Sequence, residues 1–322
     1  MTIPRRDFLR LTGGLAGAAA LHPVIGADQR RYALQSTPVG KNLVDPAGRV
    51  VFGYLAKKPT DIPLQGNSAC CVHPFNTMSG ERATDIAPPD HRDHRGIFFA
   101  WHDMEFSQVG ETLRGDFWGW GRFAPTEGRV IVNRKIDLTG QGVGGAEVTV
   151  VNDWMIAERK VMLETTRIRA SEHHGARVLD FVMAFQSDLN VRVNQMAFTG
   201  FCFRCRKDGP YVFADPQGEV TLPDSSATNP ASDWPARDWY SHTVTLPDGK
   251  VVASAVIDHP KNPPSAWHGP RAVSFLNPCI SPNGPATIAA KTALTLRYRA
   301  VAHDGAFPEG LLNDLAKSWR AT

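Results

Sequence analysis

One stretch of the chain concentrates residue types that can do chemistry. Residues 90–122 hold three of the eleven histidines and three of the eight tryptophans, with glycines where the chain must turn tightly. Imidazoles exchange protons near neutral pH, and aromatic rings often floor the pockets that hold small polar ligands. We therefore expect residues 90–122 to contribute a polar pocket.

The leading acid–base candidates stand at the start of this stretch. His91 and His94 could act as general acid or base, and Arg95 could stabilise negative charge that develops on a substrate. His73 and His259, in loops elsewhere in the chain, are the next candidates. The alternative is that these histidines cap turns and bind backbone carbonyls, but so many polar groups in one aromatic region favour a joint role.

Other side chains are candidates for holding the substrate. Trp118-Gly119-Trp120-Gly121 places two indoles beside residues without bulk, and the C–H faces of sugars stack on such rings. The alternative is that both rings belong to the core. Arg204 lies in an aromatic strand, where a charge needs a partner or a pocket. The predicted substrate-binding residues are Trp101, His102, Trp118, Arg204, Trp239 and Asn262.

Several polar segments far along the chain offer further groups for the same pocket. Asp233-Trp234 and residues 237–242 mix titratable and aromatic side chains, residues 258–264 end a strand in a rigid polar loop, and Trp267-His268 follows that loop. Any of these segments could close the pocket from another strand.

A metal site is a second interpretation of the same histidines. His91 and His94, with His73 or His102 as a third ligand, could bind a divalent ion, although loop ligands have no fixed spacing in sequence. We expect no cofactor and leave a divalent metal at His91 and His94 open. The chain has no phosphate-binding loop, nucleophile elbow, zinc-protease helix or dinucleotide motif, which weighs against those chemistries.

The elements that must position these residues are mostly strands. Apolar and polar residues alternate with period two in many segments, and residues 160–170 are the clearest example. Only Leu311, Leu315 and Trp319, at i, i+4 and i+8, predict a helix, which we expect to cap one end of the fold. Strands are expected at 49–55, 128–138, 146–156, 160–170, 177–186, 198–206, 239–246, 251–258, 272–276 and 294–302. A dozen or more strands predict an all-β, large two-sheet antiparallel β-sandwich, with a barrel as the lesser alternative.

Residues 1–27 have the pattern of a twin-arginine signal peptide. Arg5 and Arg6 precede a polar residue, Phe8 and Leu9, and a mildly apolar run leads to the small residues of a cleavage site at 25–27. We therefore predict a single domain over residues 28–322, delivered to the periplasm or secreted and not inserted in the membrane. The five cysteines are interpreted as small buried residues that could include one disulfide.

The charge of the chain gives no sign of a nucleic-acid partner. The formal net charge is +3, and the leader residues Arg5, Arg6, Arg10 and Asp7 account for +2 of it. The rest of the chain is close to neutral, whereas proteins that bind nucleic acid through their surface charge are usually basic. We expect a small molecule as the partner.

An ordered set of motifs resembles a bacterial family labelled methane oxygenase PmoA, and the resemblance covers most of the chain after the leader. The motifs are His73-Pro74 with Ser79-Gly80, Pro89-Asp90-His91 with His94-Arg95-Gly96-Ile97 and Ala100-Trp101, Asp116-Phe117-Trp118-Gly119, Asp258-His259-Pro260 with Asn262-Pro263, and Tyr298-Arg299 with His303-Asp304-Gly305. More remotely, the chain resembles galactose-mutarotase-like supersandwich proteins. The remote resemblance implies a role with carbohydrates, whereas the family label implies a metal-dependent oxidoreductase.

These observations predict an exported carbohydrate-active protein. The expected activity is acid–base chemistry on a sugar or sugar derivative, of the epimerase, mutarotase or lyase type. One alternative is a non-catalytic carbohydrate-binding sandwich, and another is the oxidoreductase that the family label implies.

Overall fold

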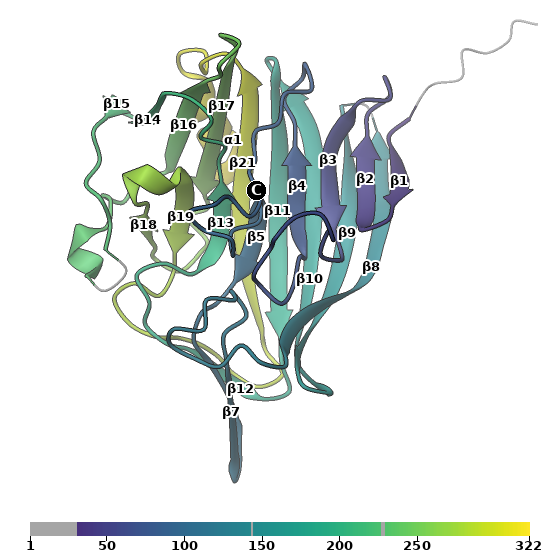
Figure 1. Cartoon of the computed structure of the whole chain (residues 1–322), viewed down its shortest axis with the longest axis vertical. Coiled ribbons are helices and arrows are strands. Elements are labelled where there is room, and N and C mark those ends of the chain that lie inside the picture. The colour runs from purple at the N-terminus through teal and green to yellow at the C-terminus, as the bar shows by residue number, and fades with distance from the viewer. Residues whose placement is uncertain (1–30, 143, 227–228) are drawn as a thin grey trace, which may run out of the picture. The chain divides into compact units, whose positions relative to one another are not determined.

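Strands dominate a computed structural model of the protein, which describes residues 31–142, 144–226 and 229–322 (Figure 1). Residues 31–322 cluster as one compact unit. The predicted signal peptide lies outside the described residues, so that assignment stays a prediction. Within the described part of the chain, no helix is long and apolar enough to cross a membrane.

An eight-stranded antiparallel sheet carries most of the residues that matter for the site. In spatial order it consists of β1 (Ala33–Thr37), β2 (Gly40–Val44), β3 (Val50–Leu55), β4 (Cys71–Phe75), β5 (Ile97–Ala100), β13 (Gly200–Arg204), β19 (Phe275–Cys279) and β18 (Ala266–His268). The centre of this sheet therefore joins segments from four distant parts of the chain.

A nine-stranded antiparallel sheet forms the second layer, and a smaller four-stranded sheet adjoins them. The strand order in the nine-stranded sheet is β15 (Gly218–Val220), β14 (Tyr211–Asp215), β16 (Trp239–Thr245), β17 (Val251–Asp258), β21 (Ala293–Asp304), β11 (Ala176–Gln186), β10 (Arg159–His173), β9 (Gly145–Ile156) and β8 (Arg129–Gly142). The strand order in the four-stranded sheet is β20 (Ala286–Ile288), β12 (Asn190–Val193), β6 (Met104–Gln108) and β7 (Glu111–Gly115).

The two large sheets pack face to face through aromatic side chains, which confirms the predicted all-β sandwich. Phe201 of β13 stacks on Tyr298 of β21 with ring centroids 4.3 Å apart, and Phe99 of β5 meets Phe185 of β11 at 4.6 Å. Burial alternates along the long strands β9, β10 and β11, as the sequence predicts for strands with one face in the core.

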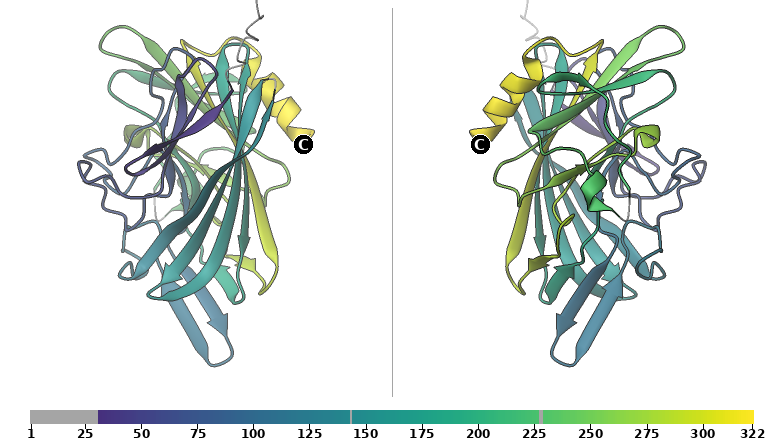
Figure 2. Two further views of the ribbon diagram at one scale, coloured as in Figure 1. Left: turned by 90° about the vertical axis from the view of Figure 1, so that its right-hand side faces the viewer. Right: turned by 90° about the vertical axis from the view of Figure 1, so that its left-hand side faces the viewer.

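The single α-helix of the described chain, α1 (Leu311–Arg320), lies on the outer face of the nine-stranded sheet rather than at an end of the sandwich (Figure 2). Its apolar side packs on β11, β16, β17 and β21, and Arg299 donates to the Leu315 carbonyl at 2.7 Å while it pairs with Asp180. The prediction that this helix caps one end of the fold is therefore wrong. The apolar stripe of the helix predicts that one of its faces is buried, but it does not predict which surface of the protein that face packs against.

The loops that build the site lie on the outer face of the eight-stranded sheet, which points away from the core. Because successive side chains of a strand point to opposite faces, Phe99 and Phe201 face the core whereas Phe98 and Arg204 face away from it. Arg204 is in register with Phe275 of β19. Residues 76–96 and 116–128 run over this outer face, where Figure 2 shows them in blue on the far side from the long strands.

Candidate active site

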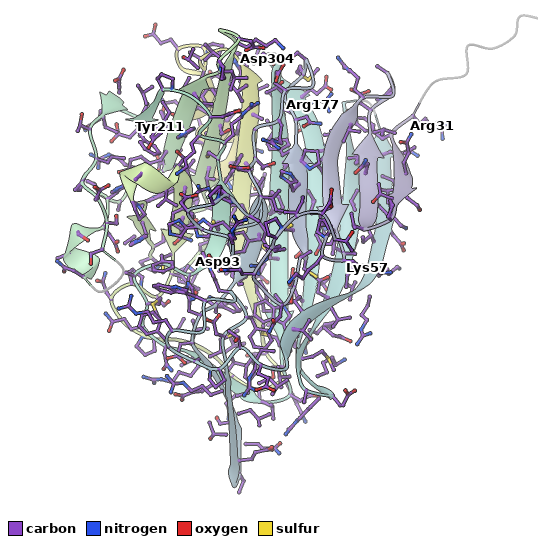
Figure 3. All side chains as sticks on the ribbon, viewed as in Figure 1. Arg31, Lys57, Asp93, Arg177, Tyr211 and Asp304 are labelled. Atoms are coloured by element: carbon purple, nitrogen blue, oxygen red, sulfur yellow. The ribbon has the colours of Figure 1, made fainter. Side chains whose placement is uncertain are left out.

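A pocket of about 410 Å³ lies on the outer face of the eight-stranded sheet. This volume is within the range of about 300–1,000 Å³ that is usual for small-ligand sites. Its lining residues are Gln65, Pro89, Asp90, His91, Arg92, Asp93, His94, Trp120, Phe198, His268, Pro270, Val273 and Phe275. Asp93 is labelled in Figure 3, in front of the strands in that view. A second hollow, of about 340 Å³ along residues 159–163 and 186–189, has no histidine in its walls.

His268 and Asp233 form a buried pair at the wall of this pocket. Trp234 and Trp267 pair through an isolated β-bridge, with a 2.7 Å bond from the Trp234 N–H to the Trp267 carbonyl, and this sets their neighbours side by side. His268 Nδ1 lies 2.8 Å from Asp233 Oδ1, and both side chains are at least 95% buried. The ring of His268 also stacks on Phe198 at 4.9 Å.

Asp90, Arg204 and Lys207 form an ion cluster beside the pocket. Arg204 Nη2 donates to both carboxylate oxygens of Asp90 at 2.9 Å, and Lys207 Nζ donates to Asp90 Oδ2 at 2.7 Å. Burial alone would raise the pKa of Asp90, but the bonds from Lys207 and Arg204 hold that pKa well below its usual range. The carboxylate therefore stays charged, and the fully buried guanidinium keeps a counterion.

His94 is enclosed by aromatic rings and by Arg204. Its ring stacks on Phe275 at 5.1 Å and on His91 at 4.7 Å, and its Nδ1 lies 3.5 Å from Arg204 Nη1. Burial lowers the pKa of His94 well below its ordinary value, and the positive charge of Arg204 lowers it further. At neutral pH His94 is therefore an uncharged imidazole.

Arg95 lies beneath the pocket and does not line it. The side chain is fully buried, and its N–H groups donate to backbone carbonyls of Ala69, Asp93 and Trp118 at 3.0, 3.1 and 2.8 Å. The guanidinium carbon also lies 4.3 Å from the ring centre of Phe98. The catalytic role predicted for Arg95 does not match this geometry, because its donors hold the loop together and do not face a ligand.

The two tryptophans of the Trp118–Gly121 segment point in different directions. Trp118 is fully buried and donates from Nε1 to Asp93 Oδ2 at 2.7 Å, whereas Trp120 is 39% exposed and lines the pocket. Gly119 between them has φ = +108°, and a Cβ there would stand 2.6 Å from the Cα of Gly66. The indole in the pocket wall is therefore that of Trp120, and the predicted Trp118 does not reach the pocket.

His102 and Asp116 support the loop that carries Trp120. Asp116 accepts from the N–H groups of Gly119 and Gly121 at 2.9 and 2.7 Å, and its Oδ2 lies 3.6 Å from His102 Nδ1. The fully buried ring of His102 stacks on Trp118 at 4.5 Å and meets Trp120 at 5.5 Å. His102 thus lies one layer behind the pocket wall and does not line it.

The remaining predicted site residues lie elsewhere. His73, in β4, binds Thr84 Oγ1 at 2.9 Å and is not part of the pocket wall. Trp101 is fully buried among core rings between the sheets. Three others belong to the surroundings of α1 and its sheet: His259 binds the Trp319 carbonyl, Trp239 binds Asn313, and Asn262 binds Asp258 and the backbone of Arg297. Of the predicted catalytic residues, only His91 and His94 line the pocket. None of the predicted substrate-binding residues lines it, although Arg204 lies beside it and binds the lining residue Asp90.

The described residues contain no group of three His, Cys, Asp or Glu side chains that could hold a metal ion. His91 and His94 stack face to face, with 29° between their planes. Lone pairs of an imidazole lie in the ring plane, so those of two stacked rings do not converge on one point. The five cysteines are buried and free, and burial raises the pKa of the Cys71 thiol to about 12. The one disulfide that the sequence allowed is not formed.

The chain belongs to DUF6807, a family of unknown function. The family model matches residues 43–317. No curated protein matches the chain. The methane-oxygenase label implied by the motifs stays a prediction.

Solved structures similar to the chain include galactose-mutarotase-like proteins. A galactose mutarotase related enzyme from Lactobacillus acidophilus has 10% identity and a TM-score of 0.37, with 84% of this chain and 97% of that one covered. A galactose mutarotase-like protein from Lactobacillus casei has 9% identity and a TM-score of 0.35, with 84% of this chain and 100% of that one covered. A GH36 α-galactosidase from Geobacillus stearothermophilus in complex with raffinose has 8% identity and a TM-score of 0.39. The match covers 86% of this chain and 40% of that one, so the chain spans two-fifths of that protein.

Proposed function

We propose that the pocket binds a carbohydrate or sugar derivative and that His268 transfers a proton on the bound molecule. The observation that carries this proposal is the buried His268–Asp233 pair at the pocket wall. A carboxylate behind an imidazole fixes the tautomer of the ring and raises its basicity, which is the usual way to build a general base.

Carbohydrate as the ligand is supported by the composition of the pocket wall. Trp120 presents a partly exposed indole, on which the C–H face of a sugar ring can stack. Asp90, His91, Arg92 and Gln65 surround it with hydrogen-bonding groups that suit hydroxyls. An apolar ligand would leave these groups without partners, which costs free energy in a desolvated site.

A non-catalytic sugar-binding protein would need Trp120 and the polar rim but not the buried pair. Burying Asp233 and His268 desolvates a carboxylate, and the bond between them offsets this cost only in part, because the second carboxylate oxygen of Asp233 is buried without a hydrogen-bond partner among the described residues. Binding a sugar does not require such a pair, whereas proton transfer does. The pair therefore favours an enzyme over a binding module. Export by the twin-arginine route remains part of the proposal, on the pattern around Arg5 and Arg6.

The proposal is tested by NMR of aldoses, ketoses and their derivatives incubated with the protein in D₂O. New resonances or deuterium uptake are expected for at least one sugar, and His268→Gln should reduce that rate by roughly 10²–10⁴-fold. His174→Asn, in an exposed turn with φ = +48°, is the matched control and should leave the rate unchanged. Binding without turnover for all sugars would identify a binding module, and absence of binding for all sugars would contradict the carbohydrate role.

A further inference from the structure

We propose that His94 and His268 are held in opposite tautomers, His94 as hydrogen-bond donor and His268 as proton acceptor, and act together on a sugar that bears a carbonyl group. This inference rests on the proposed function and names the substrate class of the same pocket. Its basis is what each imidazole meets at Nδ1.

The tautomer of His268 follows from Asp233. A carboxylate accepts hydrogen bonds and cannot donate them, so Nδ1 of His268 carries the proton that points at Asp233 Oδ1, 2.8 Å away. In the form of the ring that carries one proton, Nε2 then presents a lone pair. Within the described residues no hydrogen bond reaches this Nε2, although His268 is part of the pocket wall. His268 is therefore placed to accept a proton from a ligand.

The tautomer of His94 follows from Arg204 and is the reverse. A guanidinium only donates, so the nitrogen of His94 that faces Arg204 Nη1 at 3.5 Å presents its lone pair. The neutral ring then carries its proton on Nε2. Arg204 cannot turn away easily, because Asp90 binds its other nitrogen twice at 2.9 Å and Lys207 fixes Asp90. The nearest printed partner of Nε2 is Asp93 Oδ2 at 3.9 Å, which is too long for a hydrogen bond, and that oxygen already accepts from Trp118 Nε1. His94 is therefore set as a neutral donor.

Phe275 brings the two imidazoles to one ligand site. His94 lies over its face, with 27° between the planes and centroids 5.1 Å apart. His268 meets the same ring at 77° and 6.3 Å. The donor and the acceptor thus both contact one aromatic ring, and all three side chains are among the lining residues of the pocket.

A base and a neutral donor in one pocket suit the abstraction of a proton next to a carbonyl. His268 Nε2 would take the proton from the carbon beside C=O. The electron pair of the C–H bond would form C=C, and the C=O π pair would move to oxygen, where the His94 Nε2–H would stabilise it by a hydrogen bond. Return of the proton from His268 to carbon restores the carbonyl, so the step needs no oxidant or metal. The substrate class is a keto sugar, or an aldose in its open form.

The tautomers can be measured without any substrate. Long-range ¹H–¹⁵N spectra of histidine-labelled protein distinguish protonated from unprotonated ring nitrogens, with assignments from His94→Gln and His268→Gln. We expect His94 to be protonated at Nε2 and unprotonated at Nδ1, and His268 to be protonated at Nδ1. The same tautomer on both rings, or a proton on His94 Nδ1, would overturn the inference whether or not a sugar is known.

The chemistry is tested by deuterium uptake from D₂O at the carbon beside the carbonyl. His94→Phe removes the donor and should slow uptake by roughly 10²–10³-fold, whereas His94→Gln keeps an N–H donor and should retain more of the rate. Equal rates in both variants would contradict the donor role of His94. If sugars bind in the pocket but none takes up deuterium, the carbonyl inference fails while the binding function survives. If no sugar binds, the proposed function fails, and the spectra alone decide the tautomer pair.

Discussion

Nδ1 of His268 lies 2.8 Å from Oδ1 of Asp233, although 35 positions separate the two residues in the sequence. Their neighbours explain this, because Trp234 and Trp267 form the bridge that aligns the two dipeptides. Both indoles are almost fully buried, and Trp234 Nε1 donates to the Pro223 carbonyl at 3.0 Å. The pair at the pocket wall is thus fixed by apolar packing beside it.

We predict that Asp233→Asn impairs turnover more than binding. An asparagine amide can donate to His268 Nδ1, which would move the ring proton to Nε2 and remove the lone pair that faces the pocket. The expected loss in kcat is roughly 10²–10⁴-fold, with little change in sugar affinity. Steady-state kinetics and calorimetric titration separate the two effects. A parallel loss of affinity and kcat would instead indicate that the pocket wall has collapsed.

The two neighbouring tryptophans should have different mutant phenotypes. Trp120→Ala removes a partly exposed ring and should weaken sugar binding about three- to tenfold, the equivalent of about 0.5–1.5 kcal/mol, with little effect on stability. Trp118→Ala empties a fully buried site and should lower the free energy of unfolding by about 3–5 kcal/mol. Binding titrations and urea denaturation measure both. Unchanged affinity in the folded Trp120→Ala variant would exclude the ring from the ligand site.

Buried neutral histidines should make the fold sensitive to acid. Burial, together with the positive charge of Arg204, lowers the pKa of His242 to about 3, against 6.5 for the free side chain. Between these values the unfolded chain binds a proton that the folded chain does not. Stability is therefore lost as pH falls from about 6.5 toward about 3, by up to about 1.4 kcal/mol per pH unit for this residue.

The variant His242→Phe should reduce this acid dependence. Phenylalanine can keep the stacking on Tyr211, where the ring centroids are 4.9 Å apart, but it takes up no proton. Urea denaturation at several pH values should give a shallower dependence on pH than in the unchanged protein. The readout is the slope and not the absolute stability, since the larger ring can strain the core. His174→Asn, in the exposed turn, should leave the slope as it is, and an unaltered slope in His242→Phe would contradict the assignment.

Export is the subject of the fourth prediction. If residues 1–27 are a twin-arginine signal, replacing both Arg5 and Arg6 by lysine should retain the precursor in the cytoplasm. Fractionation followed by immunoblotting measures the distribution. A single substitution outside the pair, Arg10→Lys, is the matched control. Normal delivery of the double variant to the periplasm would show that another route is used.

The sequence alone determined the fold class, the long strands and the stretch that lines the candidate site. It missed short strands such as β1, β2 and β12, and the strand expected at 272–276 begins only at Phe275, after a 3₁₀ turn over Arg271–Val273. Alternating burial depends on the two-residue period of a strand, which is a local property, so residues 160–170 could be assigned without knowledge of their neighbours. The helix over Leu311–Arg320 was found in the same way from its apolar stripe. The dense histidine and aromatic stretch after Asp90 likewise pointed to the loop that lines the pocket.

Only the tertiary structure decided which of those residues face the pocket. Arg95 and Trp118 point inward and Trp120 points outward because the loop is held by carbonyl bonds and by the close approach of Gly119 to Gly66. Loops have no side-chain period, so direction cannot be read from spacing. His268 was visible in sequence as half of a polar–aromatic pair, but its partner Asp233 reaches it through a bridge between distant segments. Such pairings depend on long-range packing, which no local pattern of residues encodes.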